Sequence, residues 1–253
     1  MPNEQQALPR TPRILFWDIE TAPMLFWGWR TGKQYVAHTQ IKKGQRTGII
    51  CICYKWAHES KVHSLHWGLD ADSSEKMIEE FSRVVASADI SIGHNSDRFD
   101  IRHVNTQRLI NGQGPISWPT SEDTLKQFRK HFYLPSYSLD YISTMLTGSG
   151  KDRMEFRDWI DIVEDKDPNA LRKMIRYCKK DVLKLEAIYN DAQPFFKPKV
   201  HIGVITEGNR DLCPRCGSSI LCNDGYSYRP AGKYKRFKCK DCEYKGTDTR
   251  KCR

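Results

Sequence analysis

The sequence lacks any apolar run that approaches the roughly 20 residues of a membrane-spanning helix. Its N-terminal stretch, MPNEQQALPRTPR, also lacks the apolar segment of a secretory signal. The chain contains no internal repeat and no low-complexity tract. We therefore expect a cytoplasmic protein without a membrane anchor, in which residues 1–12 form a flexible arm.

The cysteine pattern does not fit a disulfide framework, because the nine cysteines are odd in number and four of them form two Cys-x-x-Cys pairs. In a reducing compartment such pairs indicate a metal site. Three further cysteines fall on apolar segments and are predicted to be core residues: Cys51, Cys53 and Cys178. Cys222 and Cys252 lie outside the paired pattern, and we do not expect them to bind metal.

The length of 253 residues suits one sizeable domain and a small module, and the 39% hydrophobic content supports a buried core. The formal net charge of +10 is unevenly distributed. Residues 197–253 carry 14 Lys and Arg against 6 Asp and Glu, whereas residues 1–196 carry 27 against 25. The basic C-terminal part therefore favours a polyanionic partner such as nucleic acid.

Hydrophobic periodicity predicts a mixed β-sheet flanked by helices, which is the α/β class. Apolar segments rich in β-favouring residues predict strands at 14–17, 48–54, 61–67, 89–93 and 116–118. Helical spacing and capping residues predict helices at 73–85 and 98–110 and a further helix that begins at Asp123.

A long helix is predicted after Asp167, an N-cap residue that Pro168 follows in the first turn. Apolar residues between Leu171 and Tyr189 recur at the spacing of one buried helix face. Two prolines, at positions 194 and 198, end this helix. We therefore predict a main domain at 13–195, a linker at 196–208 and a cysteine-bearing module at 209–253.

Acidic residues occur at the ends of predicted elements, where they can converge on one site. Asp18 and Glu20 are two positions apart at the end of the first strand, so strand alternation places both carboxylates on the same sheet face. Asp100 follows the fourth strand, and Asp181 lies one helical turn after Tyr177 on the long helix. Because close carboxylates repel one another, they favour a cation between them.

Two Mg²⁺ or Mn²⁺ ions would neutralise these four carboxylates through oxygen ligands. Two-metal phosphodiester hydrolysis requires such a pair, since one ion activates a water and the other steadies the leaving 3′ oxygen. We predict that Tyr177 orients the attacking water and that the metal ligands are Asp18, Glu20, Asp100 and Asp181.

Three segments resemble, in order, the exonuclease motifs of the DEDD superfamily: Asp18-Ile19-Glu20-Thr21, Asn95-x-x-x-Phe99-Asp100 and Tyr177-x-x-x-Asp181. The tyrosine marks the DEDDy branch, which includes the proofreading domains of family-B DNA polymerases. The resemblance covers roughly residues 13–190 and extends through Asp123-Thr124-Leu125 and Ser138-Leu139-Asp140-Tyr141. It implies an RNase H-like fold, two metal ions and removal of nucleotides from a 3′ end. No polymerase domain follows, so we expect the substrate end to come from another molecule.

Several residues near these motifs are candidates for substrate contacts. Asn95 either braces the active-site loop or touches the nucleic-acid strand, and an ordinary turn asparagine is the alternative. Phe26, Trp27 and Trp29 could stack on terminal bases. The alternative is that this loop packs its aromatic side chains into the core.

The two cysteine pairs are separated by 22 residues and match the spacing of a tetrahedral zinc site. We predict a zinc ribbon with one structural Zn²⁺ and the ligands Cys213, Cys216, Cys239 and Cys242. Gly217 permits the tight turn that follows the first pair, and so small a module depends on its metal to fold.

Residues 226–238, between the cysteine pairs, predict a β-hairpin with aromatic and basic side chains. The basic residues expected to meet phosphates are Arg229, Lys233, Lys235 and Arg236. This mixture favours single strands or frayed ends over sequence readout. The alternative is a structural ribbon whose basic face serves solubility or docks a protein.

The sequence therefore predicts a 3′-to-5′ exonuclease acting on single-stranded DNA or DNA 3′ ends, with a replication or repair protein as a further partner. The choice of DNA follows from the resemblance, and an RNA 3′ exonuclease is the nearest competitor. A hypothesis of another class is an inert nuclease fold that serves as a nucleic-acid-binding adaptor. The intact carboxylate set argues against that hypothesis.

Overall fold

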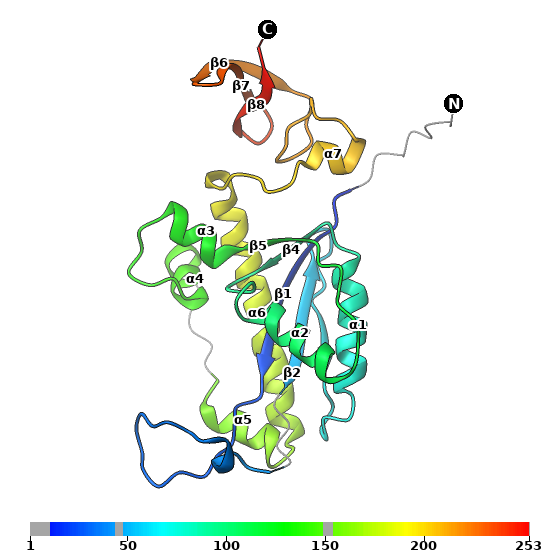
Figure 1. The fold of residues 1–253 in the computed structure, drawn as a ribbon, viewed down its shortest axis with the longest axis vertical. Coiled ribbons are helices and arrows are strands. Elements are labelled where there is room, and N and C mark those ends of the chain that lie inside the picture. Colours follow the sequence, from blue (N-terminus) through cyan, green and yellow to red (C-terminus); the bar gives the residue numbers. More distant parts are fainter. Residues whose placement is uncertain (1–10, 44–47, 149–153, 253) are drawn as a thin grey trace, which may run out of the picture.

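The computed structural model describes residues 11–43, 48–148 and 154–252, so most of the predicted N-terminal arm lies outside the described residues. A five-stranded sheet has the order β3-β2-β1-β4-β5 (Figure 1). β1 is antiparallel to β2 and parallel to β4, while β2 is antiparallel to β3 and β4 is parallel to β5. The strands are β1 (Ile14–Thr21), β2 (Ile49–Trp56), β3 (His63–His66), β4 (Ile90–Gly93) and β5 (Thr120–Asp123).

Helices cover both faces of this sheet (Figure 1). They are η1 (His38–Gln40), α1 (Ser74–Ala86), α2 (Asp100–Ile110), α3 (Thr124–His131), α4 (Leu139–Thr147), α5 (Phe156–Val163), α6 (Pro168–Ala192), η2 (Gln193–Phe195) and α7 (Ile202–Glu207). This arrangement confirms the predicted mixed sheet flanked by helices.

Neighbouring residues of β1 face opposite helix layers. Phe16 packs edge-on against Tyr189 of α6, with ring centroids 5.6 Å apart, whereas Trp17 packs against Phe81 of α1 at 4.8 Å. Because side chains alternate along a strand, the even-numbered positions of β1 that follow Phe16 also face α6. Asp18 and Glu20 therefore lie on the side of the sheet that the long helix covers.

The predicted strand at 116–118 is wrong, since the fifth strand is β5, a few residues further along the chain. The apolar ring of Trp118 stacks on Trp17, with centroids 5.8 Å apart, and its Nε1 donates to Oδ1 of Asn105 at 3.1 Å, so this residue packs against the core from a loop. The residue before β5 is a proline, which has no N–H to give to a strand ladder. The true strand reads as polar because its buried residues, Glu122 and Asp123, are held by hydrogen bonds.

The segment predicted as a linker is folded against the main domain. It contains α7, Phe196 is buried among the aromatic residues of α3 and α6, and Ile202 joins the main hydrophobic core. The guanidinium of Arg215 donates to the backbone oxygens of Pro194 and Phe196, at 3.1 and 2.6 Å. Arg215 thus connects the cysteine-bearing module to the segment that directly follows α6.

That module is a three-stranded antiparallel sheet at the opposite end of the molecule from α5 (Figure 1). Its strands are β6 (Leu221–Arg229), β7 (Gly232–Cys239) and β8 (Lys245–Lys251). β6 and β7 confirm the predicted hairpin, and β8 is a third strand that was not predicted. Over the part of the chain that the structure describes, no helix has the length and apolarity to cross a membrane.

Candidate active site and zinc ribbon

Three carboxylates meet between β1 and α6. Asp18 and Glu20 extend from β1, beside Cys53 and Cys51 of β2, and Asp181 extends from the middle of α6. Each of the three offers a carboxylate oxygen within 4.8 Å of the others. Asp181 is buried, whereas the other two are half-buried at the edge of the core. Sheet and helix thus bring together residues that are far apart in the sequence.

Asp100 provides a fourth carboxylate but stands apart from this group of three. It is the first residue of α2, is 3% exposed, and accepts hydrogen bonds from its own backbone N–H and from that of Ile19. Its charge is close enough to raise the pKa of Asp18. The structure therefore gathers all four predicted acidic residues in one region, and Asp100 is bonded there to the backbone of β1 at Ile19.

Burial and mutual repulsion make this cluster reluctant to ionise. Burial, then the charge of Asp181, raises the pKa of Glu20 to about 8. Burial raises the pKa of Asp100 to about 7. The pKa of Asp18 lies well above its ordinary value, first through burial and then through Asp100 and Glu20. A hard divalent cation would stabilise the ionised carboxylates and so counteract both burial and their mutual repulsion. The closely spaced carboxylate oxygens also fit the ligand preference of Mg²⁺ or Mn²⁺.

Tyr177 lies one helical turn before Asp181, and its hydroxyl hydrogen-bonds to the Asp181 carboxylate. Burial, followed by the charge of Asp181, raises the pKa of this phenol. The hydroxyl therefore keeps its proton at neutral pH and remains able to donate a hydrogen bond. The structure brings Tyr177 to the site where the sequence predicted it.

A buried cation at this site was not predicted from the sequence. Nζ of Lys184 lies 2.9 Å from Oδ1 of Asp181 and 2.8 Å from Oδ1 of Asp140, which stands in the first turn of α4. The side chains of Lys184 and Asp181 are each only 10% exposed. The spacing of three residues on one helix is a recognisable ion-pair signal, but the role of Asp140 depends on how α4 packs against α6.

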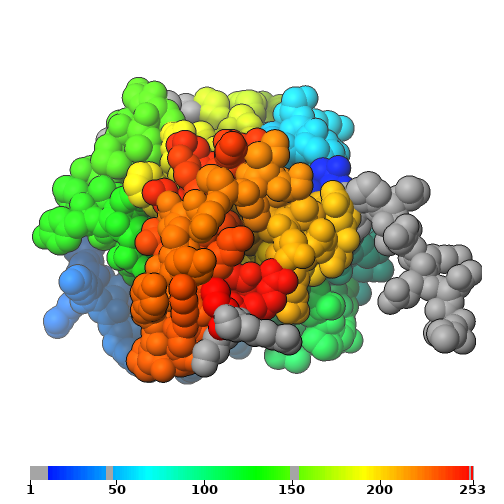
Figure 2. Space-filling view, turned by 90° about the horizontal axis from the view of Figure 1, so that it is seen from above, coloured from blue at the N-terminus to red at the C-terminus, as the bar shows by residue number. Residues whose placement is uncertain are grey.

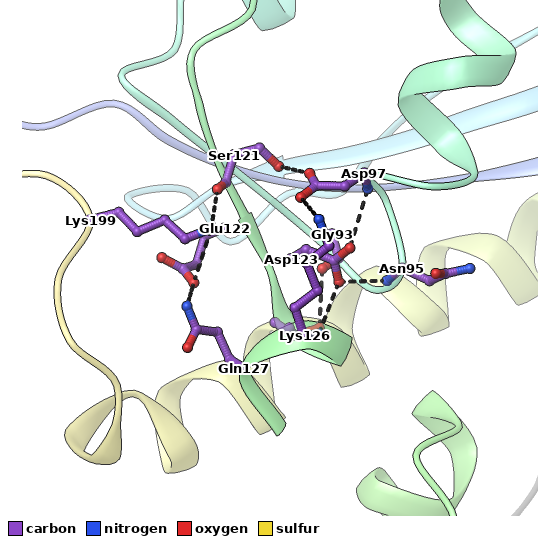
Figure 3. A network of polar contacts seen from close by, with 10 residues as sticks. Gly93, Asn95, Asp97, Ser121, Glu122, Asp123, Lys126, Gln127 and Lys199 are labelled. Carbon is purple, nitrogen blue, oxygen red and sulfur yellow. Dashed lines mark hydrogen bonds and ion pairs between the residues drawn. The ribbon is translucent and has the colours of Figure 1, made fainter. Parts of the chain in front are cut away.

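The loop between β4 and α2 is fixed by one buried carboxylate (Figure 3). Asp123, which is fully buried, accepts hydrogen bonds from the backbone N–H of Asn95 at 3.0 Å and of Asp97 at 3.3 Å. Asn95 has φ of 65°, a left-handed conformation that asparagine tolerates. Its side chain points away from Asp123. The backbone of Asn95 therefore braces the loop, while its amide group is directed outward.

The aromatic residues beyond β1 are exposed rather than packed into the core, so the core-packing alternative is wrong for them. Phe26 is 42% exposed, Trp27 73% and Trp29 98%. Phe99, directly before Asp100, is also exposed and packs its ring against His103 at 4.5 Å. The sequence signal for Phe99 was its place in the second motif, yet it was not predicted as a substrate contact.

The four paired cysteines converge in the C-terminal module, with every Sγ within 4.8 Å of the others. Cys213 and Cys242 are 3.6 Å apart, and Cys216 and Cys239 are 3.7 Å apart. A tetrahedral zinc ion with Zn–S bonds of ~2.3 Å requires sulfur separations of about 3.8 Å. The cysteines therefore fit one zinc ion.

The turn after each cysteine pair contains a residue with a left-handed backbone conformation. Gly217 has φ of 78°, and its N–H donates to the oxygen of Cys213 at 2.9 Å. Glu243 occupies the equivalent position after the second pair, with φ of 57°. The sulfurs of Cys222 and Cys252 are not part of this cluster.

The pleat of the hairpin divides the four predicted basic residues between two faces. Lys233 lies over the ring of Tyr226 at 3.8 Å, and Lys235 is paired in register with the same tyrosine. On the other face, Arg229 lies over the ring of Tyr234 at 5.0 Å. Arg236, also on that face, pairs with Asp224 at 2.8 Å. Two lysines therefore share one exposed face with two tyrosines, Tyr226 and Tyr228.

Comparisons with known proteins agree with this architecture. A model of the RNase_H superfamily matches residues 38–193, a range that includes Asp100, Tyr177 and Asp181. A solved structure of the family B DNA polymerase from the hyperthermophilic archaeon Pyrobaculum calidifontis is similar over 92% of this chain, with a TM-score of 0.54 and 14% sequence identity. The match covers 32% of the polymerase, so this chain spans about a third of its length. No curated protein sequence matches the chain.

Proposed function

This chain belongs to the RNase H superfamily, and from that premise we propose that it is a divalent-metal-dependent 3′-to-5′ exonuclease. Membership supports a nuclease function in general terms. The observation that carries the more specific proposal is the convergence of Asp18, Glu20 and Asp181, with Asp100 beside them and Tyr177 bonded to Asp181. We assign the nuclease to residues 13–195, a folded connector to 196–208 and the ribbon to 209–253.

Each side chain has a distinct part in this proposal. Asp18, Glu20 and Asp181 would hold one divalent ion, and Asp100 with Asp18 would help to hold a second. When bound, the ions supply an activated water and stabilise charge on the leaving 3′ oxygen. Tyr177 keeps its proton and directs its hydroxyl into the same space, where it can position the attacking water.

The proposed substrate is the 3′ end of single-stranded DNA. The exposed Phe26 and Trp27 offer ring faces for terminal bases, and the outward Asn95 offers an amide. In the ribbon, the face that carries Lys233, Lys235 and two tyrosines can meet a strand with both charge and ring surfaces. A replication or repair protein is the proposed source of such ends.

Polarity and substrate are tested together with strands of identical sequence. Single-stranded DNA and RNA, each labelled at the 5′ or the 3′ end, are incubated with the zinc-loaded protein and Mg²⁺ or Mn²⁺. The proposal expects a ladder from 5′-labelled DNA and immediate release of a labelled mononucleotide from 3′-labelled DNA. A ladder on RNA alone would show that the substrate is RNA and not DNA. Strand binding without any cleavage would favour a nucleic-acid-binding adaptor.

A further inference from the structure

A hollow lined with cations lies beside the active-site loop, and Asn95 is the one lining residue to which a role is given above. It has a volume of about 340 Å³ and is lined by Asn95, Arg98, Leu125, Lys126, Arg129 and Lys130. We call it the α3 pocket, because four of the six residues belong to α3. Four of its lining residues are basic and none is acidic. Its chemistry therefore suits an anion.

Two of these cations are available to a ligand. Lys126 pairs with Asp97 at 2.5 Å, and the guanidinium of Arg129 lies over the ring of Tyr137 at 5.7 Å. Arg98 and Lys130 are exposed, and neither has an ion-pair partner within residues 11–43, 48–148 and 154–252. An arginine and a lysine that face the same hollow can bind one phosphate, the arginine through paired N–H donors.

Asp123 joins the two walls of the pocket. Its carboxylate accepts from the backbone of Asn95 and Asp97 on the loop side, and from the N–H of Lys126 at the start of α3, at 3.4 Å (Figure 3). Arg98 is two residues before Asp100. The pocket is therefore held at a fixed position relative to the carboxylate cluster. Two sites that bind parts of the same substrate strand require such a fixed arrangement.

The position of α3 favours a nucleic-acid strand as the ligand. In Figure 1, α3 lies at the end of the nuclease domain that carries the ribbon. Seen from above, the green segment that contains α3 and α4 lies beside the orange and red ribbon (Figure 2). A strand held by the ribbon and threaded to the carboxylate cluster would pass this side of the domain.

We propose that the α3 pocket binds one backbone phosphate of the substrate strand, at a fixed number of nucleotides from the cleaved bond. This inference rests on the proposed nuclease function. It adds a contact that determines which phosphodiester bond of the strand lies at the carboxylate cluster. Arg98 and Lys130 supply the charge, while Leu125 offers an apolar wall for the adjoining sugar.

The test measures binding without cleavage, in the full chain carrying Asp181→Asn and Ca²⁺ in place of Mg²⁺. The probes are fluorescent single-stranded DNAs in which one phosphodiester at a time is replaced by a neutral methylphosphonate. The protein with an intact pocket is compared with Arg98→Gln/Lys130→Gln and with Lys76→Gln. Lys76 is an exposed lysine of α1 and serves as the charge control.

With the pocket intact, we expect one linkage at which the neutral replacement weakens binding most. Arg98→Gln/Lys130→Gln should be insensitive at that linkage and keep its sensitivity elsewhere. The slope of log K against log salt should fall by about 0.7, the value for one phosphate contact on a single strand. Lys76→Gln should retain both the sensitive linkage and the slope.

Three results would overturn the inference: equal sensitivity at every linkage, a double variant that behaves like Lys76→Gln, or no binding of the strand. Because hydrolysis is blocked in all samples, failure of the exonuclease proposal leaves this readout intact. Conversely, suppose that the protein without Asp181→Asn cleaves DNA and that no neutral linkage weakens binding more than another. This result would contradict the phosphate contact and leave the exonuclease proposal standing.

Discussion

Nζ of Lys184 lies 2.9 Å from Oδ1 of Asp181, so the carboxylate cluster already contains one buried cation. Asp140 holds the same ammonium from α4 at 2.8 Å. Lys184 lowers the pKa of Asp181 against the stronger effect of burial, which raises it. The lysine therefore helps to keep Asp181 ionised and oriented while it repels any second cation placed nearby.

Lys184→Gln should destabilise the protein without added divalent ions by about 3 kcal/mol, because it leaves two carboxylates without their buried partner. Mn²⁺ should then raise the melting temperature of the variant more than that of the unmodified protein, since the ion replaces the lost charge. Thermal unfolding with and without Mn²⁺ measures both effects. Lys76→Gln is the control, and an equal response to Mn²⁺ in both variants would contradict the assigned role of Lys184.

The raised pKa values of Glu20, at about 8, and Asp100, at about 7, predict how stability depends on pH. A carboxyl group with a higher pKa when folded binds more protons in the folded state, so stability falls as pH rises. Without added Mg²⁺, the melting temperature should decline from pH 4.5, which is the ordinary pKa of a glutamate, to about pH 8, which is the raised pKa of Glu20.

Glu20→Gln should flatten this decline because glutamine does not ionise, and saturating Mg²⁺ should reduce it by neutralising the cluster. Melting curves over this pH range, recorded with zinc retained, provide the measurement. If the curves of Glu20→Gln and the unmodified protein run parallel, Glu20 does not have the raised pKa.

Asn95 combines a backbone role with an outward side chain, and two substitutions separate them. Asn95→Gly keeps the left-handed conformation available, so its melting temperature should stay close to that of the unmodified protein. Asn95→Val should lose about 1–2 kcal/mol of stability, because a β-branched residue is strained there. If the amide contacts the strand, Asn95→Gly should weaken strand binding by about 1 kcal/mol, roughly fivefold. Unchanged binding would leave Asn95 a turn residue only.

Removal of zinc should unfold the ribbon and leave the nuclease domain folded. Cys239→Ser should abolish binding of a single zinc ion per chain and expose the amides of β6, β7 and β8 to hydrogen exchange. Cys222→Ser is the matched control, because its sulfur instead donates to the backbone oxygen of Lys238 at 3.2 Å. Retention of zinc by Cys239→Ser would refute the four-cysteine site.

The sequence predicted most reliably those elements whose apolar pattern is matched by their packing. The long helix α6 is one such element, since its apolar stripe lies against β1 and β2. β5 was misplaced because its buried residues are polar, and a hydrophobic pattern does not mark a strand held by hydrogen bonds. The helices α4 and α5 were not predicted, and α4 was noticed only through a motif.

The same distinction applies to the site. Asp18 and Glu20 were predictable because strand alternation fixes their common face, and Asp181 followed from its helical spacing to Tyr177. Asp123 could not be assigned its role, since its partners are backbone N–H groups on a distant loop. The α3 pocket likewise joins a loop and a helix whose lining residues are at least 27 positions apart, such as Arg98 and Leu125.

The most direct test of the central claim is the single-turnover rate at which the 3′-terminal nucleotide leaves a single DNA strand in Mg²⁺. We expect measurable release by the unmodified protein and by Lys76→Gln. We expect Asp18→Asn and Asp181→Asn to lose more activity than the roughly 10–100-fold that follows removal of an outer-shell metal partner. Release at undiminished rates by both cluster variants, folded and zinc-loaded, would contradict the assignment of these carboxylates to the reaction.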